Sequence, residues 1–333
     1  MFKAFALLVI LFVIVASLFA HNIDNYINQP ISGDIGDQKE IVEIVVDKGA
    51  SFNQVSARLV EAGFITQPLY FKLLAMYEEK TQSIKSGEYR FNKSQTPAQI
   101  LEDLVSGNTV QYKITVVEGK RFEDFFRILQ EHPKITRAIN VIDDIKAELD
   151  IKRENLEGLF FPDTYTFSSG TKDIDIIRQS HTLLRDYLDE EWPKRSKESY
   201  VSSPYEALIL ASIVEKETSV AAERPRIAGV FISRLHKKMP LQTDPTVIYG
   251  LGAEFDGNLT RKHLETDNPY NTYTRRGLPP SPIALVGKAA IQAVLHPNIT
   301  GDLYFVSKND GSHYFSKTYK EHLAAVRKYQ LKK

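Results

Sequence analysis

The chain has 333 residues, enough for two or three domains, and its 43% hydrophobic residues are ordinary for a globular protein. The 42 basic and 42 acidic side chains cancel, so charge gives no reason to expect a nucleic acid as the main partner. Because cysteine is absent, disulfides, thiolate metal sites and a cysteine nucleophile are excluded.

An apolar segment stands at the N-terminus. Residues 4–20 (AFALLVILFVIVASLFA) carry only apolar or small side chains. As a helix rising about 1.5 Å per residue they span roughly 25 Å, the short end of what a bilayer requires. A cleaved signal peptide is the alternative, but cleavage after Ala20 would place the bulky Leu18 where a small residue is needed. We therefore expect residues 1–21 to form a cytoplasmic tip and an uncleaved transmembrane helix.

The charge before this segment sets its expected orientation. Lys3 is the only charged side chain ahead of the span, which puts the N-terminus in the cytoplasm. We expect a single-pass protein of the cell (inner) membrane, with its remaining domains on the extracytoplasmic (periplasmic) side. Residues 22–40 are polar and contain Gly and Pro without an apolar period, so they predict a tether.

A weak internal repeat follows the tether. Residues 43–59 and 88–104 align without a gap, and residues 113–129 follow the same plan with one residue fewer before the helix. Each repeat predicts a short strand, a polar turn and an amphipathic helix, with Ser51 and Thr96 as N-caps of the first two helices. Such units cannot bury their apolar faces alone, so we expect them to pack together as a small α+β module that binds rather than catalyses.

The best-marked helix begins in the second half of the chain. Ser203 can cap it, Pro204 fits its first position, and Glu206 completes a capping box. Pro225 disfavours helix at the residue before it, so the helix is predicted to run to about Glu223.

Two glutamates near the end of this helix face different ways. The two acids lie in ILASIVEKETSV (209–220). On a helical wheel that turns about 100° per residue, Glu217 falls in the middle of the apolar face and Glu215 falls on the opposite face. Glu215 is therefore expected on the solvated face or in a salt bridge. Glu217 has two possible environments. It could lie at the edge of the core, where its carboxyl reaches solvent or pairs with Arg224 or Arg234. It could instead line a cleft, where desolvation raises its pKa and suits it to act as a general acid.

Loops rich in amide, hydroxyl and aromatic side chains follow this helix. The stretches 241–250 and 268–284 are stiffened by several prolines, and 296–315 continues the pattern. Amides and hydroxyls suit sugar hydroxyls, aromatic rings suit the apolar faces of sugars, and rigid loops hold such groups at low ordering cost. These loops favour the cleft interpretation of Glu217.

The motifs in this region resemble those of a known family. ASIVEKET, VFISRL, LQTDPTVIYG, YNTY and GLPPSPIA occur in the order found in the MltG (YceG-like) family of endolytic murein transglycosylases. The resemblance implies an α+β chain with an N-terminal transmembrane helix, a small LysM-like α+β module over residues 41–131 and a mixed α+β catalytic domain over residues 132–333. The LysM-like assignment rests on the architecture of the family more than on residues.

The resemblance also implies a reaction: non-hydrolytic cleavage of the MurNAc-β-1,4-GlcNAc bond in nascent peptidoglycan strands. Glu217 would protonate the glycosidic oxygen, and its carboxylate would then take the proton of the muramoyl 6-hydroxyl, leaving a 1,6-anhydro-MurNAc end. The family further suggests penicillin-binding synthases of the elongation machinery as partners, although nothing in the sequence shows them.

Further site residues are expected in the loops. The proposed substrate-binding residues, weighed against loop scaffolding, are Gln242, Thr243, Asp244, Tyr270, Asn271, Thr272 and Tyr273. Asn271 is the best of them, because its amide suits an N-acetyl group. No cofactor is expected, and the eight histidines lack metal-ligand spacing. His313 and His322 are interpreted as ordinary surface or core residues.

Two alternatives remain open. A hydrolytic muramidase would need a second carboxylate, for which Asp244 is the first candidate and Glu223 the next. A turn-capping role is the competing interpretation of Asp244. The protein could also be a non-catalytic peptidoglycan-binding scaffold in which Glu217 is structural.

Overall fold

The computed structural model describes residues 2–31 and 41–331, and the chain divides into two compact units. The first unit comprises Met1–Tyr112 and Thr166–Gly170, and the second comprises Lys113–Tyr165 and Thr171–Lys333. The third predicted repeat, formed by strand β3 (Gln111–Thr115) and helix α5 (Phe122–Glu131), thus lies largely in the second unit. The observed division at residue 112 therefore comes earlier than the expected boundary after residue 131.

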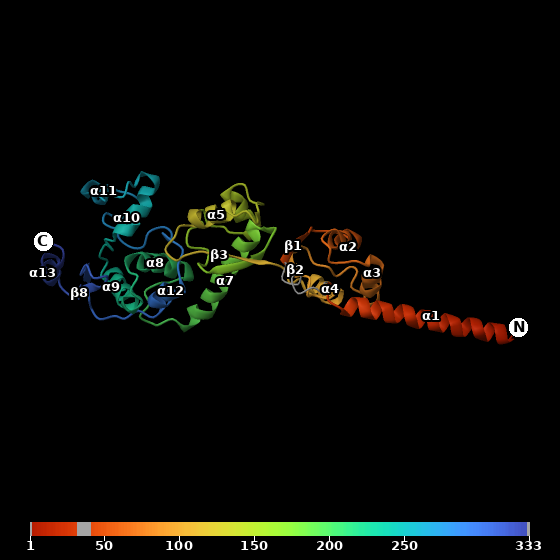
Figure 1. Cartoon of the computed structure of the whole chain (residues 1–333). Coiled ribbons are helices and arrows are strands. Elements are labelled where there is room, and N and C mark those ends of the chain that lie inside the picture. Colours follow the sequence, from red (N-terminus) through yellow and green to blue (C-terminus); the bar gives the residue numbers. More distant parts are fainter. Residues whose placement is uncertain (1, 32–40, 332–333) are drawn as a thin grey trace. The chain divides into compact units, whose positions relative to one another are not determined.

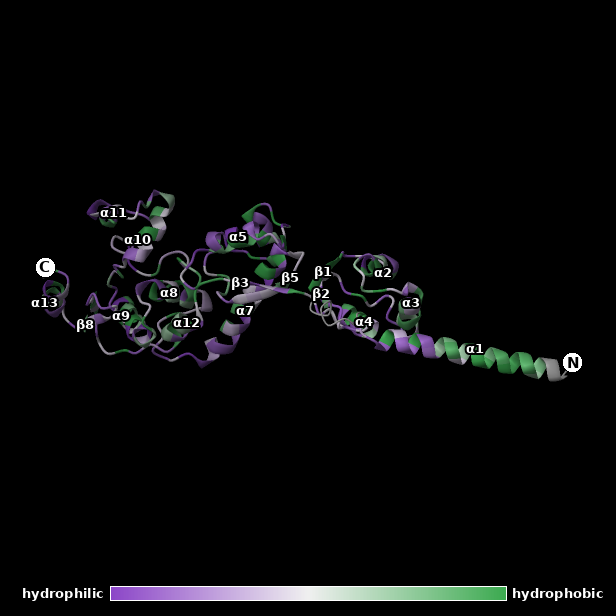
Figure 2. Cartoon of the chain, in the orientation of Figure 1, coloured by the Kyte–Doolittle hydropathy of each residue, from purple (hydrophilic) through white to green (hydrophobic). Residues whose placement is uncertain are grey.

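A long apolar helix, α1 (Phe2–Asn28), begins the first unit. It is the one helix of the described part long and apolar enough to cross a membrane, and its hydrophobic stretch is clear in Figure 2. The tether was expected to begin at residue 22, but the helix continues to Asn28. Tyr26 explains the extension, because its hydroxyl accepts hydrogen bonds from the backbone N–H groups of Thr66 and Gln67 at 3.1 and 3.0 Å. Residues 32–40 of the expected tether lie outside the described residues.

The predicted repeat is visible in the first unit. Strands β1 (Ile41–Val46) and β2 (Gly87–Asn92) pair antiparallel, with Ile41 opposite Asn92. The helices of this unit are α2 (Phe52–Glu61), α3 (Pro68–Tyr77) and α4 (Pro97–Ser106). Ser51 and Thr96 cap α2 and α4 as predicted, each in a reciprocal capping box with a glutamine at the third helical position. Aliphatic and aromatic residues of these strands and helices form one buried core.

The second unit combines many helices with short strands. Parallel strands β4 and β6 form one small sheet, and β7 with β8 forms an antiparallel hairpin. Strand β3 pairs with β5, and the residues of both strands are divided between the two units. The strands and 3-10 helices are β4 (Ile135–Thr136), β5 (Thr164–Ser168), β6 (Thr171–Lys172), β7 (Tyr304–Ser307), β8 (His313–Ser316), η2 (Trp192–Lys194), η3 (Ala221–Glu223) and η4 (Gly252–Glu254). The helices are α6 (Ile142–Leu149), α7 (Asp173–Glu191), α8 (Pro204–Glu217), α9 (Arg224–His236), α10 (Asp244–Leu251), α11 (Arg261–Glu265), α12 (Lys288–Leu295) and α13 (Tyr319–Tyr329). The mixture of helix and sheet agrees with the expected α+β class.

Helix α8 lies at the centre of the second unit. Its residues from Ala207 to Val214 are all buried, because α9, α10 and α12 pack around it (Figure 1). The helical wheel predicted one apolar face, which is wrong for this helix: Leu208 and Ser212 are buried as well. A helix covered on several sides buries even the positions that a wheel assigns to solvent.

The end of α8 differs from the prediction. Ser203 caps its start and accepts from the N–H of Glu206, as expected, but the helix ends at Glu217 rather than near residue 223. Thr218 adopts an extended conformation (φ −147°, ψ 137°), and Pro225 lies in the first turn of α9. Proline suits a helix start because it lacks an N–H that the first turn does not need. Pro225 therefore begins a helix, and Glu217 occupies the last position of a buried one.

Candidate active site

Glu217 borders a pocket of about 530 Å³ in the second unit. The pocket is walled by α9, the loop before α10, the β7–β8 hairpin and α13. Besides Glu217, its polar lining residues are Arg234, Gln242, Thr243, Asp244, Tyr273, Tyr304, Ser307, His313, Tyr319, His322 and Gln330. A second hollow of about 440 Å³, lined by residues 118–120, 215–219 and Arg224, also has Glu217 in its wall. Glu217 therefore contributes to the walls of two hollows.

The surroundings of Glu217 favour its protonated form. Burial raises its pKa from 4.5 to about 7. The Thr243 hydroxyl, which donates to its Oε1, and the nearby His313 both lower this pKa, while the negative charge of Asp244 raises it. Because the resulting pKa is close to neutral, the group can give up a proton and take one back at neutral pH.

Glu215 has a different environment, as predicted, but not a solvated one. Its side chain is 5% exposed, and it pairs with Arg224 at 3.0 Å and accepts from the N–H of Gly287 at 3.1 Å. The salt-bridge alternative is confirmed, and the solvated-face alternative is wrong because α8 is covered on that side too. Since Arg224 is occupied by Glu215, it does not pair with Glu217.

The loop before α10 brings three of the expected site residues to this pocket. Gln242 takes a left-handed conformation (φ 52°), and its N–H donates to the carbonyl of Thr272 at 3.1 Å. The N–H of Thr243 donates to the Thr272 hydroxyl at 3.1 Å, which fixes the Thr243 side chain toward Glu217. Asp244 begins α10 and accepts from the Tyr273 hydroxyl at 2.5 Å. Four expected residues, Gln242, Thr243, Asp244 and Tyr273, therefore line the Glu217 pocket.

The other expected residues lie elsewhere. Asn271 is fully buried: its amide donates to three loop carbonyls at 2.7 to 3.2 Å, and its carbonyl accepts from the N–H of Tyr273. Thr272 is also buried and bonds to Thr243 and Thr246. With its amide used by the loop itself, Asn271 has no group left for an N-acetyl substituent. Both residues hold the loop in shape, which was the competing interpretation.

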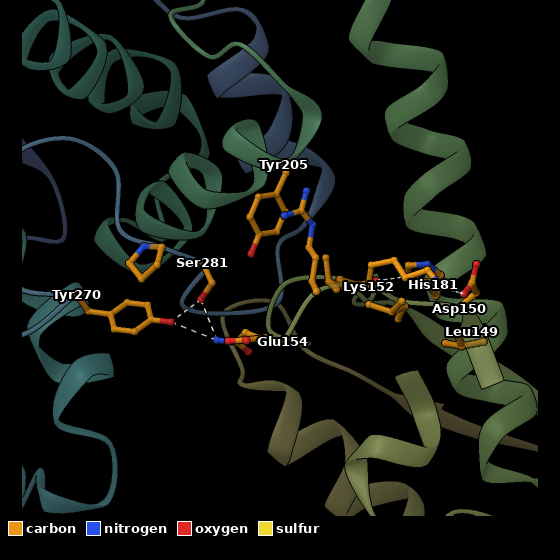
Figure 3. Close-up of a pocket in the computed structure, with 13 residues that line it drawn as sticks. Leu149, Asp150, Lys152, Glu154, His181, Tyr205, Tyr270 and Ser281 are labelled. Carbon is orange, nitrogen blue, oxygen red and sulfur yellow. Dashed lines mark hydrogen bonds and ion pairs between the residues drawn. The ribbon is translucent and has the colours of Figure 1, made fainter. Parts of the chain in front are cut away.

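Tyr270 borders a separate and larger pocket, of about 860 Å³, shown in Figure 3. Its hydroxyl lies 2.7 Å from that of Ser281, and the amide of Asn155 donates to both oxygens. The acidic residues in this wall, Asp150 and Glu154, are exposed. This pocket thus lacks a desolvated acid, whereas the smaller one has Glu217.

The wall of the Glu217 pocket formed by the β7–β8 hairpin and α13 was not predicted from the sequence. His313 and His322 were interpreted as ordinary residues, yet both line it together with Arg234, Tyr304 and Tyr319. His313 is held by Glu223, which accepts from its backbone N–H at 2.9 Å and lies 2.7 Å from its Nδ1. Glu223, a candidate second acid, is therefore committed to a histidine. The aromatic and polar residues at 296–315 were a signal for this wall, but its contact with the end of α8 is purely tertiary.

Within the described residues, no group of three or more His, Asp or Glu side chains comes close enough to hold a metal ion. The site therefore consists of one desolvated carboxyl, its hydroxyl donor, and nearby aromatic, amide and cationic groups. Such a lining can bind a sugar chain and transfer a proton at one point along it.

Comparisons with known proteins show the family of this chain. The model of the YceG-like family matches residues 44–328. A relative from Bacillus subtilis (strain 168), named endolytic murein transglycosylase, is 35% identical over 88% of this chain and 86% of its own length. A protein of the same name from Streptococcus pneumoniae (serotype 2, strain D39) is 26% identical over 96% of this chain, which spans only 64% of that relative.

A solved structure extends the likeness to the fold. The crystal structure of a yceG-like protein from Listeria monocytogenes is 31% identical in sequence and superposes with a TM-score of 0.55. The match covers 86% of this chain and 99% of the other. With a family model that spans most of its length and a relative above 30% identity, this chain belongs to the YceG-like family.

Proposed function

We propose that the chain is a peptidoglycan lytic transglycosylase, an enzyme of the lyase class that cleaves glycan strands internally. The names of the Bacillus and Streptococcus relatives support the general activity. The observation that carries the proposal is the Glu217 carboxyl, partly buried in a pocket wall with a pKa of about 7. The two hollows that Glu217 borders suit internal cleavage, because a strand cut in its middle needs room beyond the single sugar at the acid.

The reaction is a proton transfer in two directions by one residue. Protonated Glu217 donates to the glycosidic oxygen between MurNAc and GlcNAc as the bond breaks and positive charge develops at C1 of the muramoyl residue. The carboxylate then accepts the proton of the muramoyl 6-hydroxyl, whose oxygen bonds to C1 and closes the 1,6-anhydro ring. Glu217 ends the cycle protonated. A pKa near neutral suits both halves, because a stronger acid would be a poor base.

The hydroxyl of Thr243 keeps the Glu217 carboxyl in position for both halves of the cycle. The remaining pocket wall supplies groups suited to sugars: Gln242 offers an amide, and Tyr273 and Tyr304 offer rings. Asp244 orients Tyr273 through its hydroxyl. Binding energy from these contacts is the means by which the site would hold a strand for reaction.

A hydrolytic muramidase is the second candidate, favoured by one observation. Asp244 lies in the same pocket close enough to raise the pKa of Glu217, and it is exposed enough to meet a water molecule. Its bond from the Tyr273 hydroxyl instead assigns it to orientation. Mass spectrometry of the digested glycan distinguishes the two, because an anhydro end is lighter than a reducing end by one water.

The anchoring and partners belong to the same proposal. Helix α1 would cross the cytoplasmic membrane with the N-terminus inside, holding the catalytic unit on the outer side where strands emerge. The first unit would serve as a LysM-like module that binds glycan. Penicillin-binding synthases of the elongation machinery would supply the nascent strands.

Replacing Glu217 by Gln tests the catalytic assignment. The amide keeps size and polarity but neither donates nor accepts a proton as an acid does, so we expect release of anhydro-ended fragments from purified peptidoglycan to be lost. Glu254→Gln, an exposed glutamate of η4 that lines neither hollow, is the matched control and should retain the anhydro product. Continued cleavage by the Glu217→Gln protein would refute the assignment.

A further inference from the structure

One cation in the Glu217 pocket lacks an acidic partner. Arg234 on α9 is only 8% exposed, and within the described residues no carboxylate lies within ion-pair distance of its guanidinium. Nε donates to the carbonyl of Leu303 at 2.7 Å, and Nη1 donates to those of Pro240 and Leu241 at 3.2 and 2.9 Å. All of these acceptors are neutral. Burying a charge without a counterion is costly, so proteins rarely keep one without a use.

The acids of the same pocket are occupied by other donors. Glu217 accepts from the Thr243 hydroxyl, and Asp244 accepts from that of Tyr273. Arg234 also reaches the side-chain oxygen of Gln242, at 3.3 Å, through Nη1. Among the described contacts, Nη2 of Arg234 makes no hydrogen bond, and Arg234 lines the pocket.

A second unsatisfied group lies beside it. Nδ1 of His322, on α13, is buried without a hydrogen-bond partner among the described residues. The ring of Tyr304 connects the two residues: it stacks on His322 with centroids 5.2 Å apart, and the Arg234 guanidinium lies 5.1 Å from its centroid. Burial and the charge of Arg234 lower the pKa of His322, so the imidazole is neutral at pH 7 and its N–H can donate without adding charge.

We propose that Arg234 and His322 form a subsite for a carboxylate carried by the substrate. The guanidinium supplies the charge and one donor, and the imidazole, which lines the same pocket, supplies a second donor. This inference rests on the proposed function, because a muramoyl strand bears carboxylates beside the scissile bond. The carboxylate is either the free lactyl group of a bare muramoyl residue or a carboxylate of its stem peptide.

Such a subsite gives the enzyme a basis for selecting its substrate. A glycan of N-acetylglucosamine alone has the same β-1,4 linkage but no carboxylate. It would leave the buried Arg234 unpaired in the complex, and leaving a buried polar or charged group without a partner reduces affinity. Arg234 and His322 thus act as specificity residues, and Glu217 performs the proton transfer.

The test uses the full chain in detergent with Glu217→Gln, so that binding is measured without cleavage. N-acetylmuramic acid and its neutral methyl ester are titrated while NMR or calorimetry reports binding. We expect the acid to bind roughly tenfold or more tightly than the ester, as a charge-assisted hydrogen bond would give. Equal affinities would exclude the lactyl carboxylate, and together with equal cleavage rates on intact and peptide-free strands they would overturn the subsite alone. Failure of both to bind would overturn it together with the proposed substrate.

A variant tests His322 without disturbing the loop that Arg234 holds. His322→Phe preserves the stacking on Tyr304 but removes both ring nitrogens, so it should reduce the preference for the acid over the ester severalfold. Arg327→Met is the matched control, since it removes an exposed charge from α13 outside the pocket, and should leave the preference unchanged. An unchanged preference in the His322→Phe protein would exclude His322 from the subsite.

Cleavage by the wild-type protein identifies the source of the carboxylate. Faster cleavage of strands whose peptides have been removed by an amidase assigns the lactyl carboxylate, and faster cleavage of intact strands assigns the stem peptide. Equal rates on both and on a carboxylate-free chitin oligosaccharide would refute the proposed selectivity.

Discussion

The hydrogen bond from Thr243 to Glu217 gives the sharpest test of the catalytic chemistry. It stabilises the charged carboxylate and so lowers its pKa against the effect of burial. Valine at position 243 has nearly the same shape but no donor. A hydrogen bond to a charged group contributes about 1.5 to 3 kcal/mol, and about 1.36 kcal/mol corresponds to one pKa unit. Thr243→Val should therefore raise the pKa of Glu217 by roughly one to two units.

The direction of the effect on activity follows from the role of the proton. Cleavage needs protonated Glu217, so the rate falls as pH rises through its pKa, which is about 7 in the wild type. In Thr243→Val this alkaline limb should move to roughly pH 8 or above. The assay is the release of anhydro-ended fragments from purified peptidoglycan, followed as kcat/KM between pH 5 and 9.

A second substitution separates this effect from loosening of the loop. Thr246 lies in the first turn of α10, directly after this loop, and its hydroxyl donates to the carbonyl of Thr243 rather than to Glu217. Thr246→Val should lower stability and activity without moving the alkaline limb. An alkaline limb that stays in place in the Thr243→Val protein would refute the argument that this hydroxyl sets the pKa of Glu217.

Two further predictions concern the same carboxyl. His313 lowers the pKa of Glu217, so His313→Gln should move the alkaline limb of the pH profile to higher pH, by less than Thr243→Val does. Asp244 raises the same pKa, so Asp244→Asn should move the limb to lower pH. Shifts of the same sign in the two variants would contradict this electrostatic account. Because the pKa of Glu217 rises from 4.5 in the unfolded chain to about 7 in the folded one, the wild type loses up to about 3 kcal/mol of stability as pH rises across that interval. Glu217→Gln lacks this loss, so its melting temperature should exceed that of the wild type more at pH 8 than at pH 5, and calorimetry at the two values checks the difference.

Local patterns in the sequence were sufficient for several elements. Ser51, Thr96 and Ser203 begin helices because their side chains accept from an N–H in the first turn, a relation that involves only residues three apart. The long apolar stretch of α1 likewise needs no tertiary information to be recognised. The position of Glu217 on an otherwise apolar surface also came from the helical period alone.

Other features depended on packing between distant segments. The wheel could not show that α8 is covered on several sides, so it left Glu215 either in solvent or in a salt bridge, and only packing selects the buried pair with Arg224. Asn271 looked suited to an N-acetyl group, but its amide is consumed by carbonyls of its own loop. An amide in a sequence looks the same whether it faces a ligand or the backbone, and only the folded loop separates these uses.

The sequence by itself determined which acid lies among aliphatic residues, and is therefore the proposed proton donor, because one acid on an aliphatic helix is a local departure from a local pattern. The tertiary structure decided the environment that makes it useful. Thr243 reaches Glu217 across 26 positions, and His313, Tyr304 and His322 arrive from a hairpin and helix at the end of the chain. The pKa of a carboxyl depends on the water it loses and the charges it meets. Both are set by segments distant in sequence, so only folding fixes them.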